Sequence, residues 1–156
     1  MRKIIFVSLF IFTFSIKSFG TIQTSDLLII GSDTILIDQF PLEQFYKKGH
    51  LHNPGFFPEF VITNCWRGYK AVWEIKDNQF YLKAIYDCNF KESVSINRIG
   101  RESDKDGLIF ADWFSGSFKI NVRTKSEIRE SWNFGHLFMR KKKIKIAEGR
   151  VINSLN

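Results

Sequence analysis

The sequence predicts a mainly β fold (α+β), either a strongly curved antiparallel sheet or a small sandwich, with one or two short helices. Two observations support this prediction. About eight short β-prone runs follow one another, with turn-forming residues at roughly ten-residue spacing. Hydrophobic residues make up 44% of the chain and include 17 Phe, which supplies enough large apolar side chains for one core. No internal repeat or long linker divides the sequence, so we expect a single domain.

The start of the chain has the features of a secretory signal peptide. Two basic residues follow the initial Met, residues 4–16 form a continuous apolar run, and small residues come next, where a signal peptidase reads them. The alternative is an uncleaved membrane anchor, but the run is short for a bilayer and Lys17 ends it. We therefore expect an exported protein, periplasmic or extracellular, with a signal peptide at 1–20 and the mainly β domain at 21–156.

The first elements of this domain are a hairpin and a helix. Apolar runs at 27–30 and 33–37 flank a Gly-Ser turn, and apolar residues on both faces predict a buried pair of strands. Residues 41–49 begin with Pro and an acid and end with lysines and Gly, which is the order of a short helix. A strand is expected around residues 60–63.

A second hairpin occupies the centre of the chain. β-prone runs at 65–76 and 79–88 flank Asp77 and Asn78, the strongest short-range hairpin signal in this sequence. If these two residues form the loop, the register follows by counting back from it. The expected pairs are Lys76 with Gln79, Ile75 with Phe80, Trp73 with Leu82, Ala71 with Ala84, and Tyr69 with Tyr86.

The rest of the chain predicts short elements joined by polar turns. Residues 93–101 have the apolar spacing of a short helix, and residues 103–107 form a polar turn. Strands are expected at 108–114, 118–122, near 132–140, at 144–147 and at 150–152. From Lys143 to Ile146, Lys and Ile alternate, which indicates one wet face and one dry face.

Both cysteines lie in the part expected to be exported, where oxidation is permitted. We expect a Cys65–Cys88 disulfide, which contributes on the order of 3 kcal/mol for a loop of this length. A regular ladder leaves the two residues one diagonal step apart, and a bulge or kink at Gly68 would bring the sulfurs closer. Two buried free thiols are the alternative.

The candidate binding residues are Trp66, Arg67 and Tyr69, which lie beside a glycine in the central hairpin. A guanidinium at this place can stack on an indole and present a planar fork to a carboxylate. The alternative is that Arg67 pairs internally with Asp87 or Asp112 and locks the hairpin. We favour the internal pair, because structural ion pairs are commoner than exposed recognition arginines.

Without residues 1–20 the net charge falls from +7 to +4, and much of what remains positive lies near the end of the chain, in Arg140, Lys141, Lys142 and Lys143. This cluster could make peripheral contact with an anionic surface of lipid headgroups or acidic polymers. Alternatively, its lysines form a solvated strand face that discourages edge-to-edge pairing. Nucleic acid is not an expected partner of an exported chain.

The sequence assigns no catalytic residue, metal site or cofactor. Cys65, Asp112 and His136 supply the residue types of a thiol hydrolase, but no local signature accompanies them. His50 and His52 lie two residues apart on a loop that offers no further metal ligands. The sequence contains no phosphate-binding glycine loop, zinc spacing or nucleophile elbow.

Several short motifs occur in one order along most of residues 21–156. They are Asp33-Thr34-Ile35, Pro41-Leu42-Glu43, Cys65-Trp66-Arg67-Gly68-Tyr69, Trp73-Glu74-Ile75 with Tyr81-Leu82, and Ala111-Asp112-Trp113. Together they resemble an uncharacterised family of small exported proteins from Bacteroidetes-type bacteria, and the Cys-Trp-Arg-Gly-Tyr hairpin core is the most specific of them. The resemblance implies a bacterial envelope or extracellular setting and no catalytic residue.

Three hypotheses for the function follow. The first is an exported, non-enzymatic binding domain that contacts another envelope protein through Trp66, Arg67 and Tyr69, a class that includes immunity-type inhibitors of exported toxins. Its positive charge argues against neutralising a basic nuclease, because like charges repel. The second is a module that binds glycans or anionic surface polymers with aromatic residues beside the basic strand. The third is the thiol hydrolase.

Overall fold

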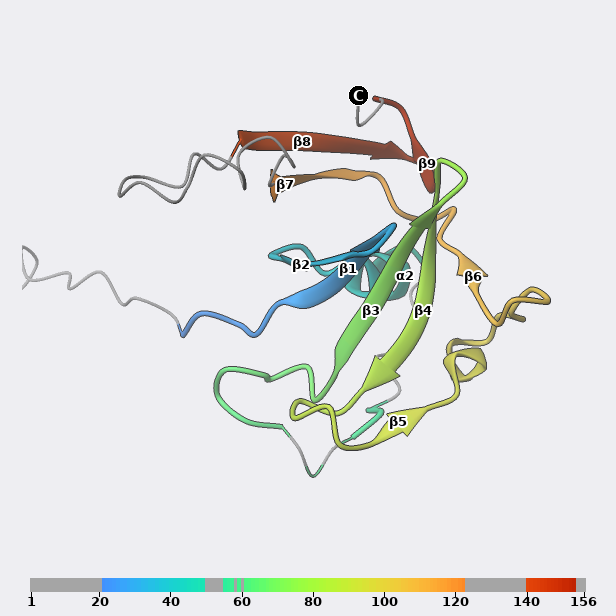
Figure 1. Cartoon of the computed structure of the whole chain (residues 1–156). Helices are drawn as coiled ribbons and strands as arrows, with labels where there is room; N and C mark the ends of the chain where they lie inside the picture. Colours follow the sequence, from blue (N-terminus) through green and yellow to red (C-terminus); the bar gives the residue numbers. More distant parts are fainter. Residues whose placement is uncertain (1–20, 50–54, 58, 60, 123–139, 154–156) are drawn as a thin grey trace, which may run out of the picture.

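A computed structural model describes residues 21–49, 55–57, 59, 61–122 and 140–153 (Figure 1). Within these residues the fold is mainly β, as predicted, with nine strands in one curved sheet, one α-helix and one 3-10 turn. The elements are β1 (Asp26–Ile30), β2 (Asp33–Ile37), α2 (Pro41–Gly49), β3 (Lys70–Lys76), β4 (Gln79–Tyr86), β5 (Ser93–Val94), η2 (Ile96–Ile99), β6 (Ile109–Phe110), β7 (Gly116–Val122), β8 (Arg140–Ala147) and β9 (Arg150–Val151). The sheet order is β2-β1-β3-β4-β9-β8-β7, and β5 and β6 also pair with β4.

β1 and β2 form the predicted hairpin, but the sheet is mixed and not antiparallel throughout. β2 is largely exposed, so the expected burial of both strands is right for β1 alone. On its other side β1 pairs with β3 in parallel, with Leu28 beside Trp73. Parallel pairing needs a long crossover, which β2, α2 and the following loop supply.

The central hairpin has the predicted register near its turn and a different one farther away. The pairs Lys76–Gln79, Ile75–Phe80 and Trp73–Leu82 are confirmed. Lys83 is then left out of the ladder, so that Ala84 pairs with Val72 and Tyr86 with Lys70, and the expected partners of Ala84 and Tyr86 are wrong by one residue. This bulge lets both Leu82 and Ile85 face the core, which strict alternation does not allow.

α2 confirms the predicted helix and packs on the core through Leu42 and Tyr46, which are buried. The indole Nε1 of Trp113 donates to the carbonyl oxygen of Pro41 at 3.0 Å and fixes the start of the helix. Just before the helix, the side-chain amide of Gln39 donates to the carbonyl oxygen of Ser117 at 2.5 Å. This hydrogen bond ties the chain after β2 to β7, so the two ends of the sheet order lie close together.

Aromatic rings fill the core. Trp73 and Phe80 stack with their centroids 4.9 Å apart, and the ring of Phe80 also lies 5.2 Å from Phe114 and 5.5 Å from Phe118. All four side chains are buried. The core therefore joins the central hairpin to β7.

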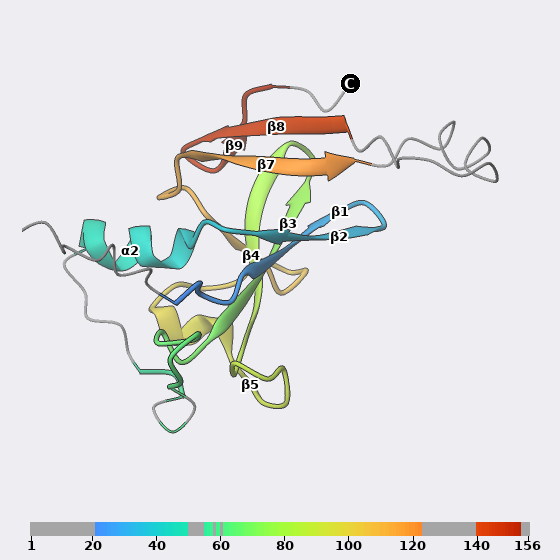
Figure 2. The same ribbon diagram turned by 90° about the vertical axis from the view of Figure 1, so that its left-hand side faces the viewer.

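The ribbon of β7 and β8 has the predicted wet and dry faces. Ile144 and Ile146 are buried, whereas Lys143 and Lys145 are exposed. A turn at Glu148 and Gly149 connects β8 to β9. Figure 2, turned by 90° from Figure 1, shows this ribbon at one end of the molecule, with the loop before β3 at the other.

Other predicted elements are shorter than expected or of another type. Residues 93–101 hold β5 and η2 in place of one helix, and the strand expected at 108–114 is reduced to β6. Both changes follow from β4, whose edge pairs with β5 and then with β6. The strand expected around 60–63 is wrong for residues 61–63, which are exposed, and the one near 132–140 lies outside the described residues up to Arg140.

Candidate functional site

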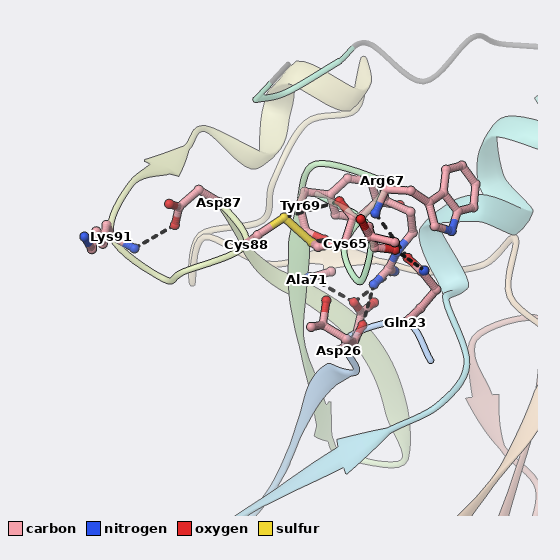
Figure 3. The surroundings of a disulfide bond; sticks show 12 residues. Gln23, Asp26, Cys65, Arg67, Tyr69, Ala71, Asp87, Cys88 and Lys91 are labelled. Atoms are coloured by element: carbon pink, nitrogen blue, oxygen red, sulfur yellow. Dashed lines mark hydrogen bonds and ion pairs between the residues drawn. A yellow bond between two sulfur atoms is a disulfide. The ribbon is translucent and has the colours of Figure 1, made fainter. Parts of the chain in front are cut away.

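The predicted disulfide between Cys65 and Cys88 is present at the base of the central hairpin (Figure 3). Both cysteines are buried. The expected kink at Gly68 is also present, since its φ is +71°. A Cβ atom at this glycine would lie 2.9 Å from the carbonyl oxygen of Phe57, so the backbone there has no room for a side chain. The kink turns the chain between Cys65 and the start of β3 at Lys70. Trp66 and Arg67 therefore lie on a short loop that the disulfide holds at Cys65.

Arg67 lies inside this loop and forms an internal ion pair, as favoured, but with a different partner from either of those expected. Its Nη1 donates to Oδ1 of Asp26 at 3.1 Å and its Nη2 to the carbonyl oxygen of Thr24 at 2.8 Å (Figure 3). The guanidinium also lies 3.6 Å from the centroid of the Phe40 ring. Both charged side chains are fully buried, so the guanidinium presents no fork to solvent.

Asp26 lies at the start of β1 and accepts hydrogen bonds from three residues. Besides Arg67, they are the backbone N–H of Ala71 at 3.2 Å and the indole Nε1 of Trp73 at 3.0 Å. Burial raises the pKa of Asp26 from 3.8 to about 6, against the opposing effects of Arg67, Trp73 and Ala71. The carboxylate thereby joins β1 to the loop and to β3.

The two acids expected to pair with Arg67 have other partners. Oδ1 of Asp87 accepts from the backbone N–H groups of Lys91 and Glu92, at 2.6 and 3.2 Å. Asp112 receives two hydrogen bonds from Arg101, at 2.6 and 3.1 Å, in an exposed pair. Both expected pairings of Arg67 are therefore wrong.

Tyr69 is buried as well, and its hydroxyl donates to Oε1 of Glu43 in α2 at 2.8 Å. Burial, reinforced by the negative charges of Glu43 and Asp26, raises the pKa of this phenol well above its usual value. Of the three candidate binding residues, only Trp66 faces solvent, with 57% of its surface exposed. Counting alternate residues from buried Cys65 would have placed Trp66 outside and Arg67 inside.

Three further exposed apolar residues lie on the segments next to Trp66. Ile22, Val61, Ile62 and Trp66, here called the Trp66 surface, keep between 47% and 89% of their surface in solvent. They lie on two segments joined by hydrogen bonds. Thr24 N–H donates to the carbonyl oxygen of Asn64, and the side chain of Gln23 bonds both Thr63 and the backbone N–H of Trp66.

A second feature is an open hollow of about 520 Å³ near β9, lined by Lys48, Phe110, Asp112, Trp113, Glu148 and Arg150. Lys48 donates to the carbonyl oxygen of Trp113 at 2.5 Å, and Asp112 is held by Arg101. Glu148 and Arg150 form no ion pair with any described residue. The hollow thus offers two free charges of opposite sign beside aromatic rings.

The residues of the proposed hydrolase do not assemble in the described structure. Cys65 is bonded to Cys88 and has no thiol, Asp112 is paired with Arg101, and His136 lies outside the described residues. His50 and His52 lie outside them as well. Among the residues that are described, no three acids, histidines or cysteines lie close enough together to hold a metal ion.

No helix in the described ranges is long and apolar enough to cross a membrane. Comparisons of the chain with family models, with curated proteins and with solved structures found no match. The resemblance based on the Cys-Trp-Arg-Gly-Tyr motif stays a prediction.

Proposed function

We propose that this chain is an exported, non-enzymatic binding domain that holds another envelope or secreted protein against the Trp66 surface. The observation that carries this proposal is the grouping of exposed apolar side chains. The described residues include seven large hydrophobic side chains that are exposed, and four of the seven belong to this one surface. Scattered apolar residues are ordinary on a protein surface, but several on two adjoining segments indicate a contact site.

The Trp66 surface is rigid, which favours binding. The disulfide holds the loop at Cys65, and Gln23 and Thr24 hold the residues before and after Cys65 through hydrogen bonds of 2.7 to 3.1 Å. The buried ion pair of Arg67 and Asp26 also joins the backbone of this loop to the start of β1. A loop ordered in advance loses little conformational entropy when a partner binds.

Trp66 is the expected centre of the contact. Tryptophan is enriched among the residues whose truncation costs most at protein interfaces, because it buries a large rigid ring. Val61 and Ile62 would then exclude water around it. An immunity-type inhibitor of an exported toxin belongs to this class of function.

Two features support export. The disulfide requires an oxidising compartment to form and persist. The first 20 residues have the charge and apolar pattern of a signal peptide. Together they support a periplasmic or extracellular location.

A second candidate function is glycan binding in the hollow near β9. Phe110 is partly exposed there, and the free charges of Glu148 and Arg150 can hydrogen-bond to hydroxyl groups. This arrangement matches the expectation of aromatic residues beside the basic strand. A Phe110→Ala variant that loses retention on a polysaccharide matrix, while Trp66→Ala keeps it, would support this alternative.

The test of the proposed function is affinity capture on the immobilised, oxidised chain from envelope and medium extracts. Trp66→Ala is the test variant, and Leu36→Ala is its matched control, because Leu36 is 68% exposed on β2. Arg67→Ala is unsuitable as a control, since removal of a buried charge disturbs the fold. We expect one stoichiometric partner, retained by wild type and Leu36→Ala and weakened about 30-fold or more by Trp66→Ala.

The result that contradicts the proposal is equal capture by wild type and Trp66→Ala. A partner lost equally from both variants would also contradict it, because the contact would then depend on exposed apolar area anywhere on the sheet. Unfolding curves of both variants establish that neither substitution alters the fold.

A further inference from the structure

We infer that the β7–β8 ribbon carries a second binding site, for a linear anionic polymer with phosphate or carboxylate groups along its chain. The site is the lysine ladder, defined as Lys119 on β7 and Lys143 and Lys145 on β8. All three side chains are exposed, and none forms an ion pair with a described residue. This inference is independent of the Trp66 surface.

The register of the ribbon places these charges together. Lys119 and Lys143 are direct cross-strand partners, and Lys145 lies two residues along the same strand face, opposite Ser117. Direct partners lie about 5 Å apart and alternate residues of a strand about 7 Å apart. Like charges in direct opposition destabilise a strand pair, and nothing described nearby neutralises them. A bound anionic chain would supply the missing charge.

Protection of a sheet edge does not account for Lys145 on β8. One edge of β8 is paired with β7 throughout. On the other edge, the side chain of Asn153 accepts from the backbone N–H of Lys145 at 2.6 Å and donates to the carbonyl oxygen of Lys143. The backbone N–H of Ile152 donates to the carbonyl oxygen of Lys145. On this side the N–H and the carbonyl oxygen of Lys145 and the carbonyl oxygen of Lys143 are therefore already bonded, so the edge at Lys145 does not need a repelling charge.

The shape of the ladder favours a linear polymer over a small anion or a membrane. The charges stand in a row on a strand face, so successive groups of an extended chain can each meet one lysine. The same face carries Ser117, Ala147 and one exposed large apolar side chain, Ile152, which the register of β8 and β9 places opposite Lys145 and which is 62% exposed. A single isoleucine is a small anchor, and stable attachment to a membrane needs a larger apolar group besides basic charge. Nor does the described part of the face offer an aromatic ring for stacking a nucleobase.

The row continues toward the hollow. Arg150 pairs with Ala147 across the β8–β9 turn and therefore lies on the same face as the ladder. Its exposed guanidinium lines the hollow together with Glu148. A chain that follows the ladder would end beside Arg150.

The experiment measures binding of the full exported chain to long-chain polyphosphate and to polygalacturonate, as a function of salt. The test variant carries Lys119→Gln, Lys143→Gln and Lys145→Gln. The matched control carries Lys47→Gln, Lys91→Gln and Lys105→Gln, which remove the same charge from exposed positions elsewhere. The two polymers distinguish phosphate from carboxylate as the anionic group.

We expect wild type and the control to bind at least one polymer and the ladder variant to bind it about 100-fold more weakly, at roughly fivefold per lysine. The slope of log affinity against log salt should fall by about 2 to 3 in the ladder variant. Equal weakening in both variants would overturn the inference, because only net charge would matter. Absent polymer binding, or tighter binding to phosphatidylglycerol vesicles or to an oligonucleotide, would also overturn it.

Discussion

The two ends of the molecule distribute charged and apolar side chains in opposite ways. At the disulfide end, Arg67 and Asp26 are paired in the interior and Trp66 stands in solvent. At the ribbon end, Ile144 and Ile146 are inside, and Lys143 and Lys145 stand outside. The ribbon follows the ordinary rule for a half-buried sheet, and the disulfide end reverses it.

The reversal indicates that the disulfide end is shaped for more than stability. A buried ion pair contributes little compared with apolar residues of the same size, because desolvation offsets the attraction of the charges. What the pair of Arg67 and Asp26 does provide is a fixed position for the loop that carries Trp66. At the ribbon end, by contrast, ordinary burial positions the strands and leaves the lysines free to bind.

The largest effect on this comparison should come from Arg67→Ala. The variant leaves the Asp26 carboxylate buried without its cation, and we expect the free energy of unfolding to fall by about 3 to 5 kcal/mol at pH 7. Urea unfolding followed by tryptophan fluorescence measures it. The matched control is Arg101→Ala, which breaks the exposed pair with Asp112 and should cost no more than about 1 kcal/mol. Similar losses in the two variants would mean that burial does not distinguish the pairs.

The pH dependence of stability sharpens the comparison, with an intermediate effect. The folded-state pKa of Asp26 is raised from 3.8 to about 6, so between these values the folded chain binds a proton that the unfolded chain releases. The stability contributed by this group is therefore fully present below about pH 4 and is lost as the pH rises through 6, by no more than about 3 kcal/mol. The measurement is urea unfolding of wild type and Asp26→Asn from pH 4 to 7. Parallel curves for the two proteins would contradict the prediction.

The smallest effect, and one of opposite sign, is expected from Lys119→Glu. An acid opposite Lys143 replaces a repulsion across the strands with an attraction, so the protein should become more stable by about 0.5 kcal/mol. Thermal unfolding at low salt measures this gain, which high salt should remove. A loss of stability at low salt would show that the two side chains do not face each other.

Local features of the fold could be predicted from the sequence, and distant pairings could not. Asp77 and Asn78 fix the central turn and the first pairs of its hairpin, and the lysine alternation fixes the faces of β8. The bulge at Lys83 depends on which residues the core accepts, and the parallel pairing of β1 with β3 depends on a crossover of some 40 residues. Neither leaves a local signal.

The same limit applies to the candidate site. The disulfide was predictable because two cysteines leave one pairing. The partner of Arg67 was not, because Asp26 lies 41 positions earlier in the chain and resembles any polar residue before an apolar run. The grouping of Trp66 with Ile22, Val61 and Ile62 depends on hydrogen bonds between residues 23–24 and the loop. The sequence gives no signal for these bonds.

The parallel pairing of β1 with β3 sets an order of events during biosynthesis. A chain that is made from its N-terminus presents β1 long before β3 and the Cys65 loop exist. Until then Leu27, Leu28, Ile29 and Ile30 form a short apolar β-prone segment without its final neighbour. Asp26 flanks that segment with a charge, which opposes self-association of unpaired strands. The Asp26 carboxylate, which is buried in the folded protein, is therefore expected to oppose aggregation of the unfolded chain.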